Sequence, residues 1–209
     1  QYYLISNDAI GNVFISSLLK AADRGVRVRL LLDDIQTQGY DAGMAALDSH
    51  PNFEIRIFNP FSGRSFRMGD AITSFSRINR RMHNKSFTVD NQITIIGGRN
   101  IADEYFGART DVNFNDVDVM AIGPIVRDVS AMFDLYWNHE AAAPVPAFAK
   151  MPKDPAAELL AVRGRLDKEI EDIRKTEYAK AVIEDYEGYF QANMEIFTWA
   201  DYILAYDSP

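Results

Sequence analysis

The first part of the chain changes from a helical to an alternating pattern of apolar residues. Residues 8–12 supply turn and capping side chains, and residues 13–22 then repeat apolar positions with the period of a helix that ends near Gly25. Residues 26–33 alternate apolar and polar side chains before becoming wholly apolar, as an inner strand does. The pattern predicts a helix followed by a buried strand.

Similar helical and alternating segments follow. They predict helices at 43–49 and 124–138 and strands at 53–58, 86–89, 93–96 and 118–122. The turn pair Asp90 and Asn91 separates the second and third of these strands, which indicates a hairpin. Alternating helices and strands predict an α/β fold with a mixed, mostly parallel sheet covered by helices on both faces.

The composition changes after the last of these elements. Residues 141–155 contain four prolines and several alanines, which is typical of an extended linker. We therefore expect an α/β domain over residues 1–140 and a helical extension over residues 156–209. Helices are expected at 156–175 and 177–202, and the aromatic stripe of the second helix favours a packing face over a lipid-facing or partner-facing one.

Composition and charge exclude several classes of protein. The content of 47% hydrophobic and 25% charged residues in a chain of 209 is ordinary for a globular protein with a substantial core. A net charge of −8 disfavours nucleic acid as a partner, because polyanion binding draws on many Lys and Arg contacts. Without cysteine there is no disulfide, thiolate metal site or thiol nucleophile. No apolar run is long enough to cross a bilayer.

Positive charge is concentrated in one region despite the acidic total. The basic side chains around Asp70 are Arg64, Arg67, Arg77, Arg80, Arg81 and Lys85. They run up to and into the stretch that carries the candidate chemistry. A phosphate-facing surface and a solvated loop are equally consistent with this cluster.

The candidate chemistry lies in a pattern of fixed residue types, H-x-K-x4-D-x6-G-G-x-N. Its members are His83, Lys85, Asp90, Gly97, Gly98 and Asn100. In an extended strand alternate side chains share a face, so a nucleophilic imidazole and the Lys85 cation would meet one phosphate. Lys85 and the Asn100 amide would offset negative charge in the transition state, and Gly97 and Gly98 would let the substrate approach the backbone.

A carboxylate is expected to orient the nucleophilic imidazole. Asp116 and Asp118 stand at the start of a predicted strand and are the candidates, although either could be a solvated strand residue. Asp90 is grouped with the catalytic residues, yet its turn position favours a supporting role over a chemical one. His50 and His139 are interpreted as structural histidines.

The motif resembles the signature of the phospholipase D superfamily. Residues 21–34 and 97–106 are also similar to bacterial cardiolipin synthases of the C-type branch. The resemblance implies that His83 attacks a phospholipid phosphodiester and forms a phosphohistidine, from which a second phospholipid takes the phosphatidyl group. It also implies Asp116 as the orienting carboxylate, peripheral association with a bacterial inner membrane, and no metal or organic cofactor.

Members of that family carry two H-x-K motifs, whereas this chain has three histidines and a single motif. We therefore expect the chain to be the first catalytic half of a longer enzyme, completed by a second half or by a second copy. A phosphodiesterase or nuclease that acts as a homodimer is the alternative enzyme. A membrane-surface module that only holds phosphate is the alternative without activity.

Overall fold

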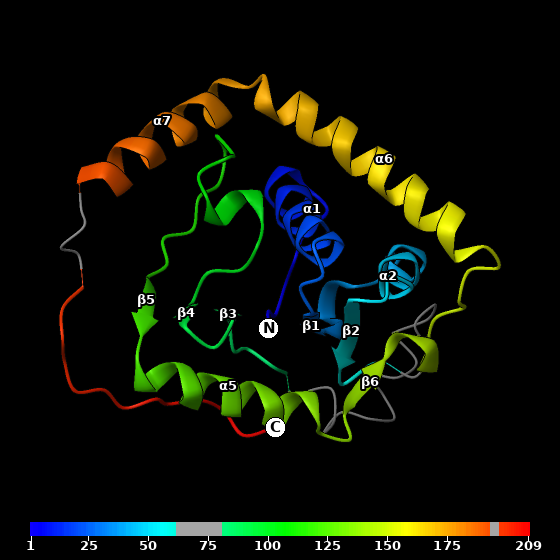
Figure 1. Ribbon diagram of the computed structural model, residues 1–209, viewed down its shortest axis with the longest axis horizontal. Coiled ribbons are helices and arrows are strands. Elements are labelled where there is room, and N and C mark those ends of the chain that lie inside the picture. The colour runs from blue at the N-terminus through cyan, green and yellow to red at the C-terminus, as the bar shows by residue number, and fades with distance from the viewer. Residues whose placement is uncertain (62–80, 193–196) are drawn as a thin grey trace.

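The computed structural model describes residues 1–61, 81–192 and 197–209 (Figure 1). Its helices are α1 (Ala9–Asp23), α2 (Asp41–Asp48), α5 (Pro124–Trp137), α6 (Pro155–Arg174) and α7 (Glu177–Ala192). Its strands are β1 (Val28–Asp33), β2 (Phe53–Phe58), β3 (Ser86–Val89), β4 (Ile93–Gly97), β5 (Asp118–Ile122) and β6 (Ala142–Pro144). The strands and helices predicted between residues 8 and 175 are present, with ends shifted by a few residues.

The strands form two small sheets with the orders β1-β2-β6 and β3-β4-β5. The first is mixed, as predicted, because β1 and β2 are parallel and β2 and β6 are antiparallel. The second is antiparallel throughout. The expected mostly parallel pairing is therefore not observed among the described strands. A short turn between β3 and β4 forces them to run in opposite directions, and an alternating sequence pattern does not reveal strand direction.

The N-terminal segment runs between the two sheets. On one side the backbone N–H of Tyr2 donates to the carbonyl of Leu31 in β1 (3.0 Å). On the other side the N–H of Ser86 in β3 donates to the carbonyl of Gln1 (2.9 Å). The N–H of Ile101 donates to the carbonyl of Leu4 (3.2 Å). The end of β1, the N-terminal segment and the start of β3 are consequently neighbours.

Helices cover both faces of β1. Leu30 and Leu32 belong to a core shared with α1, α2 and α6, whereas Leu31 belongs to a second core shared with α5. This alternation is expected for an inner strand, since successive side chains point to opposite faces. The predicted covering of the sheet by helices is confirmed for this strand.

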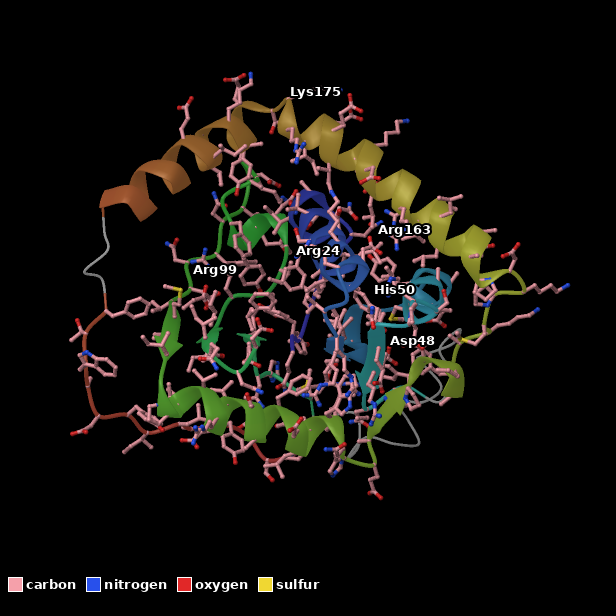
Figure 2. The ribbon with its side chains drawn as sticks, viewed as in Figure 1. Arg24, Asp48, His50, Arg99, Arg163 and Lys175 are labelled. Carbon is pink, nitrogen blue, oxygen red and sulfur yellow. The ribbon has the colours of Figure 1, made fainter. Side chains whose placement is uncertain are left out.

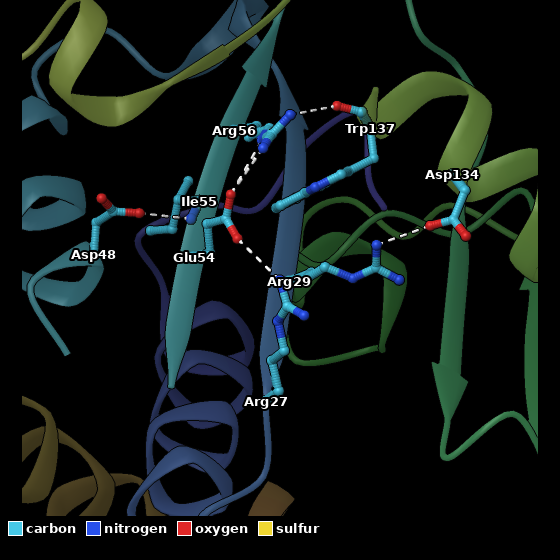
Figure 3. A network of polar contacts seen from close by, with 8 residues as sticks. All are labelled: Arg27, Arg29, Asp48, Glu54, Ile55, Arg56, Asp134 and Trp137. Atoms are coloured by element: carbon cyan, nitrogen blue, oxygen red, sulfur yellow. Dashed lines mark hydrogen bonds and ion pairs between the residues drawn. The ribbon is translucent and has the colours of Figure 1, made fainter. Parts of the chain in front are cut away.

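Polar contacts fix α5 against the sheet (Figure 3). Arg29 of β1 pairs with Asp134 of α5 (2.8 Å), and its guanidinium lies 4.8 Å from the centre of the Phe133 ring. Arg56 of β2 donates to the carbonyl of Trp137 (2.8 Å). The pairs are partly exposed, so they mainly orient α5, and the buried apolar contacts stabilise its packing.

The α6 helix packs across α1 and α2 (Figure 1). Arg163 of α6 holds Asp23, the last residue of α1, at 2.6 Å, and the guanidinium keeps the pKa of Asp23 below its usual value. His50, which is labelled in Figure 2, contacts the same carboxylate through Nε2 (3.2 Å) and accepts the N–H of Asn52 through Nδ1. The structural interpretation of His50 is therefore confirmed.

The C-terminal region differs from the sequence expectation in two places. Within the predicted linker, β6 pairs with β2, so this segment belongs to the edge of a sheet. The helix predicted through residue 202 ends at Ala192 in α7, and residues 197–209 form no helix or strand. Trp199 is 82% exposed, which contradicts a packing role for this member of the aromatic stripe. The domain boundaries themselves stay a prediction.

None of the described helices combines the length and the apolar content that a bilayer-spanning segment requires.

Candidate functional site

His83 and Lys85 meet around one aromatic ring. Both precede β3, so they do not lie in a strand as expected. The His83 ring is exposed and packs on Tyr3 with 4.4 Å between ring centroids, and Lys85 Nζ lies 5.5 Å from the centre of the same ring. Lys85 Nζ also donates to the carbonyl of His83 (2.7 Å). The predicted nucleophile and cation are thus brought together by Tyr3, which the sequence analysis did not single out.

Two opposing effects of the surroundings act on the pKa of Lys85. Partial burial lowers the pKa of Lys85, and the negative charge of Asp116 opposes that effect. The same carboxylate stands directly against Gly98, because a Cβ added there would overlap Asp116 Oδ1. Asp116 therefore approaches the predicted site from the segment before β5.

Asp118 has a different partner. Its carboxylate binds Arg99 Nε (2.9 Å), and Arg99 also donates to the carbonyl of Asp116 (3.0 Å). Within the described residues no hydrogen bond joins either carboxylate to the His83 ring. Which group orients the imidazole consequently stays a prediction, although Asp116 is the one whose charge acts on Lys85.

The two glycines make room for protein atoms. A Cβ on Gly97 would lie 2.5 Å from the carbonyl oxygen of Val117 and would overlap Asp118, so Gly97 allows β4 and β5 to approach closely. From the sequence, this space was predicted to serve the substrate. In the structure the neighbouring strand segment fills it.

Asn100 is buried and forms hydrogen bonds with two neighbours. Its side-chain oxygen accepts the N–H of Leu4 (3.2 Å), and its amide donates to the hydroxyl of Tyr105 (3.0 Å). These bonds fix the N-terminal segment against the loop after β4. The amide group has a second N–H, so these two bonds do not decide whether Asn100 can donate to a phosphate oxygen, and that role stays a prediction.

Asp90 lies at the far end of β3 from His83. It is exposed, and both Asp90 and Asn91 have a φ of 52°, in the left-handed region that a tight hairpin turn requires. This position agrees with the supporting role favoured for Asp90 and separates its carboxylate from the His83 ring.

Asp33 and Arg81 form an ion pair near the site that the sequence did not predict. Asp33, the last residue of β1, is fully buried and binds Arg81 Nη1 (3.2 Å). Burial raises the pKa of Asp33, and Arg81 and backbone N–H groups oppose the rise. A carboxylate directly after an apolar parallel strand was the available signal. Of the basic cluster, Arg64, Arg67, Arg77 and Arg80 lie outside the described residues.

Cavities lie on both sides of this group. His83 and Arg81 line one of about 700 Å³ together with Tyr136, His139 and residues 207–209. Tyr3 and Asp33 line another of about 400 Å³, whose other walls include residues of α1, α2 and α6. The His83 ring is therefore accessible from a cavity large enough for a phosphodiester head group. Among the described residues, no three His, Asp or Glu side chains are grouped as metal ligands.

Comparison with known proteins shows the family of this chain. Residues 1–137 match the family described as "Cardiolipin synthase, PLD-like domain", so the chain belongs to that family. The resemblance stated from the motif is confirmed.

The relatives include proteins from several bacteria. The chain is 53% identical over 158 residues to cardiolipin synthase C of Escherichia coli, covering 76% of this chain and 33% of that protein. It is 35% identical over 213 residues to an uncharacterized protein of Helicobacter pylori, covering 100% and 42%. It is 30% identical over 150 residues to a cardiolipin synthase of Staphylococcus aureus, covering 68% and 27%. The chain thus spans less than half the length of these relatives.

Proposed function

We propose that this chain supplies the nucleophile for phosphatidyl transfer between phospholipids, as in cardiolipin synthesis. The observation that carries the proposal is the meeting of His83 and Lys85 on the Tyr3 ring beside an open cavity. Membership of a cardiolipin synthase family supports phospholipids as the substrates. Acting on them implies peripheral contact with a membrane surface.

The proposed reaction has two successive steps. A ring nitrogen of His83 attacks phosphorus, the P–N bond forms while the P–O bond to the leaving alcohol breaks, and the alcohol takes up a proton. The hydroxyl oxygen of a second phospholipid then attacks phosphorus and loses its proton as the P–N bond breaks. Lys85 stabilises the negative charge that grows on the phosphoryl oxygens in both steps.

The proton for the leaving alcohol must come from another group. One imidazole cannot be neutral for attack and protonated for donation in the same step. We propose that a second H-x-K half of the same enzyme, or a second copy of the chain, supplies that group. Phospholipids and this second half are the proposed partners.

Replacing His83 tests the nucleophile. In the complete protein, His83→Asn should abolish formation of cardiolipin from phosphatidylglycerol vesicles and remove the acid-labile phosphohistidine seen after rapid quenching. The melting temperature should stay near that of the wild type, because the His83 ring is exposed.

His50→Gln is the matched control. His50 is a buried histidine with structural partners, so its loss should lower stability and leave transfer intact in the folded protein. Transfer by His83→Asn at the wild-type rate would refute the proposed function. Cleavage of DNA without any action on phospholipid would favour the nuclease alternative.

A further inference from the structure

The buried carboxylate of Asp33 joins two distant segments of the chain. Its Oδ1 accepts the N–H of Ile35 (2.9 Å) and Nη1 of Arg81 (3.2 Å). Its Oδ2 accepts the backbone N–H of Met82 (3.0 Å). The bond to Ile35 caps a local turn, whereas the other two tie the end of β1 to the residues directly before His83.

Arg81 and Met82 are held from further sides as well. The Arg81 guanidinium donates to the carbonyl of Asn59 (3.4 Å) and lies 4.3 Å from the centre of the Phe61 ring. The Met82 side chain is completely buried in the core that α5 shares with the sheet. The backbone before His83 is therefore fixed by an ion pair, a main-chain hydrogen bond and a buried side chain.

The burial of this ion pair needs an explanation beyond stability. A buried carboxylate is costly to desolvate, and a buried pair is often no more stabilising than an apolar pair of the same size. A turn cap alone would need only one oxygen and no cation. What the pair adds is a defined position for residues 81 and 82 relative to Tyr3, against which the His83 ring packs.

We infer that Asp33 is a positioning residue for the His83 nucleophile, acting through Met82, and that Arg81 is the counter-ion that fixes it. This inference rests on the proposed function of His83. Small displacements of a reacting group cost large factors in rate, so the effect should appear in turnover rather than in substrate binding.

The test compares Asp33→Asn with Asp48→Asn in the complete protein, using phosphatidylglycerol in detergent micelles and measuring cardiolipin. Asp48 also accepts a backbone N–H, that of Ile55 (2.7 Å). This bond connects α2 to β2 and does not involve the residues before His83. Asp33→Asn should lower kcat by roughly 10- to 100-fold with KM changed less than about twofold. Asp48→Asn should lower the melting temperature and leave both constants unchanged.

A second pair of variants covers the case in which Asp33→Asn does not fold. Arg81→Lys keeps the positive charge and should retain most of kcat, whereas Arg81→Gln should lose it without a matching change in KM. Normal kcat in folded Asp33→Asn, or equal kcat in the two Arg81 variants, would overturn the inference. Equal losses of kcat in Asp33→Asn and Asp48→Asn would also overturn the inference.

His83→Asn in the same assay separates this inference from the function on which it rests. If that variant still forms cardiolipin, the proposed function is wrong whatever Asp33 does. If it is inactive while Asp33→Asn has normal kcat, only the role of Asp33 is refuted.

Discussion

At the scale of single residues, Tyr3 is the side chain on which the site is assembled. Its ring contacts both the His83 imidazole and the Lys85 ammonium group. Burial, and then the charge of Asp33, raise the pKa of the Tyr3 phenol, while Arg81 opposes the shift. The phenol is therefore neutral at physiological pH, and we expect Tyr3 to act through the face of its ring.

Substitutions at Tyr3 separate the ring from the hydroxyl. Tyr3→Phe keeps the face and should retain kcat within about threefold, whereas Tyr3→Leu removes the stacking and cation contacts, worth about 1–2 kcal/mol together, and should lower kcat roughly tenfold. Steady-state kinetics of both variants in the complete protein provide the check. A large loss in Tyr3→Phe would assign the hydroxyl a direct role.

At the scale of elements, the β3–β4 hairpin places His83, Lys85 and Gly97 at one end and Asp90 at the other. His83 and Lys85 precede β3, Gly97 ends β4 and Gly98 follows it, and the turn at Asp90 and Asn91 lies away from both. The antiparallel pairing returns the chain to the starting end of β3, which is why residues distant in the motif can face one site.

The hairpin predicts how Asp90 responds to substitution. Asn adopts positive φ readily, so Asp90→Asn should leave both activity and melting temperature close to wild type. Valine is strained there, so Asp90→Val should cost about 1–2 kcal/mol of stability. Thermal unfolding and cardiolipin formation measure the two effects. Loss of activity in a stable Asp90→Asn variant would show that the carboxylate takes part in the chemistry.

At the scale of the whole molecule, α6 and α7 extend along one side of the α/β body and the C-terminal residues pass along α5 (Figure 1). Tyr178 of α7 donates to the carbonyl of Phe106 (2.7 Å), and Tyr202 donates to Asp128 of α5 (2.8 Å). Residues 207–209 form part of the lining of the cavity beside His83. A displacement of these three residues would therefore change access to the His83 ring.

The proton requirement predicts the behaviour of the 209-residue chain by itself. A monomer should be inactive on phospholipid, and activity should appear only if two copies bring their His83 residues to one interface. Light scattering combined with the vesicle assay distinguishes these states. If a monomer is active, His139→Gln should be examined next, since His139 lines the same cavity as His83.

The sequence by itself predicted most of the local elements and supplied the candidate chemistry. Residues 53–58 and 118–122 form strands as their apolar patterns predicted, because periodicity is a local property of the chain. The H-x-K motif identified the family for the same reason, since its residues lie close together in the sequence.

The tertiary structure decided which distant residues join the motif. The contact of Tyr3 with His83 and the bond from Met82 to Asp33 depend on the N-terminal segment lying between two sheets. Strand direction was likewise decided by connections and packing. Contacts between residues far apart in the chain leave no periodic trace in either segment, because each side chain alone satisfies an ordinary pattern of burial and polarity.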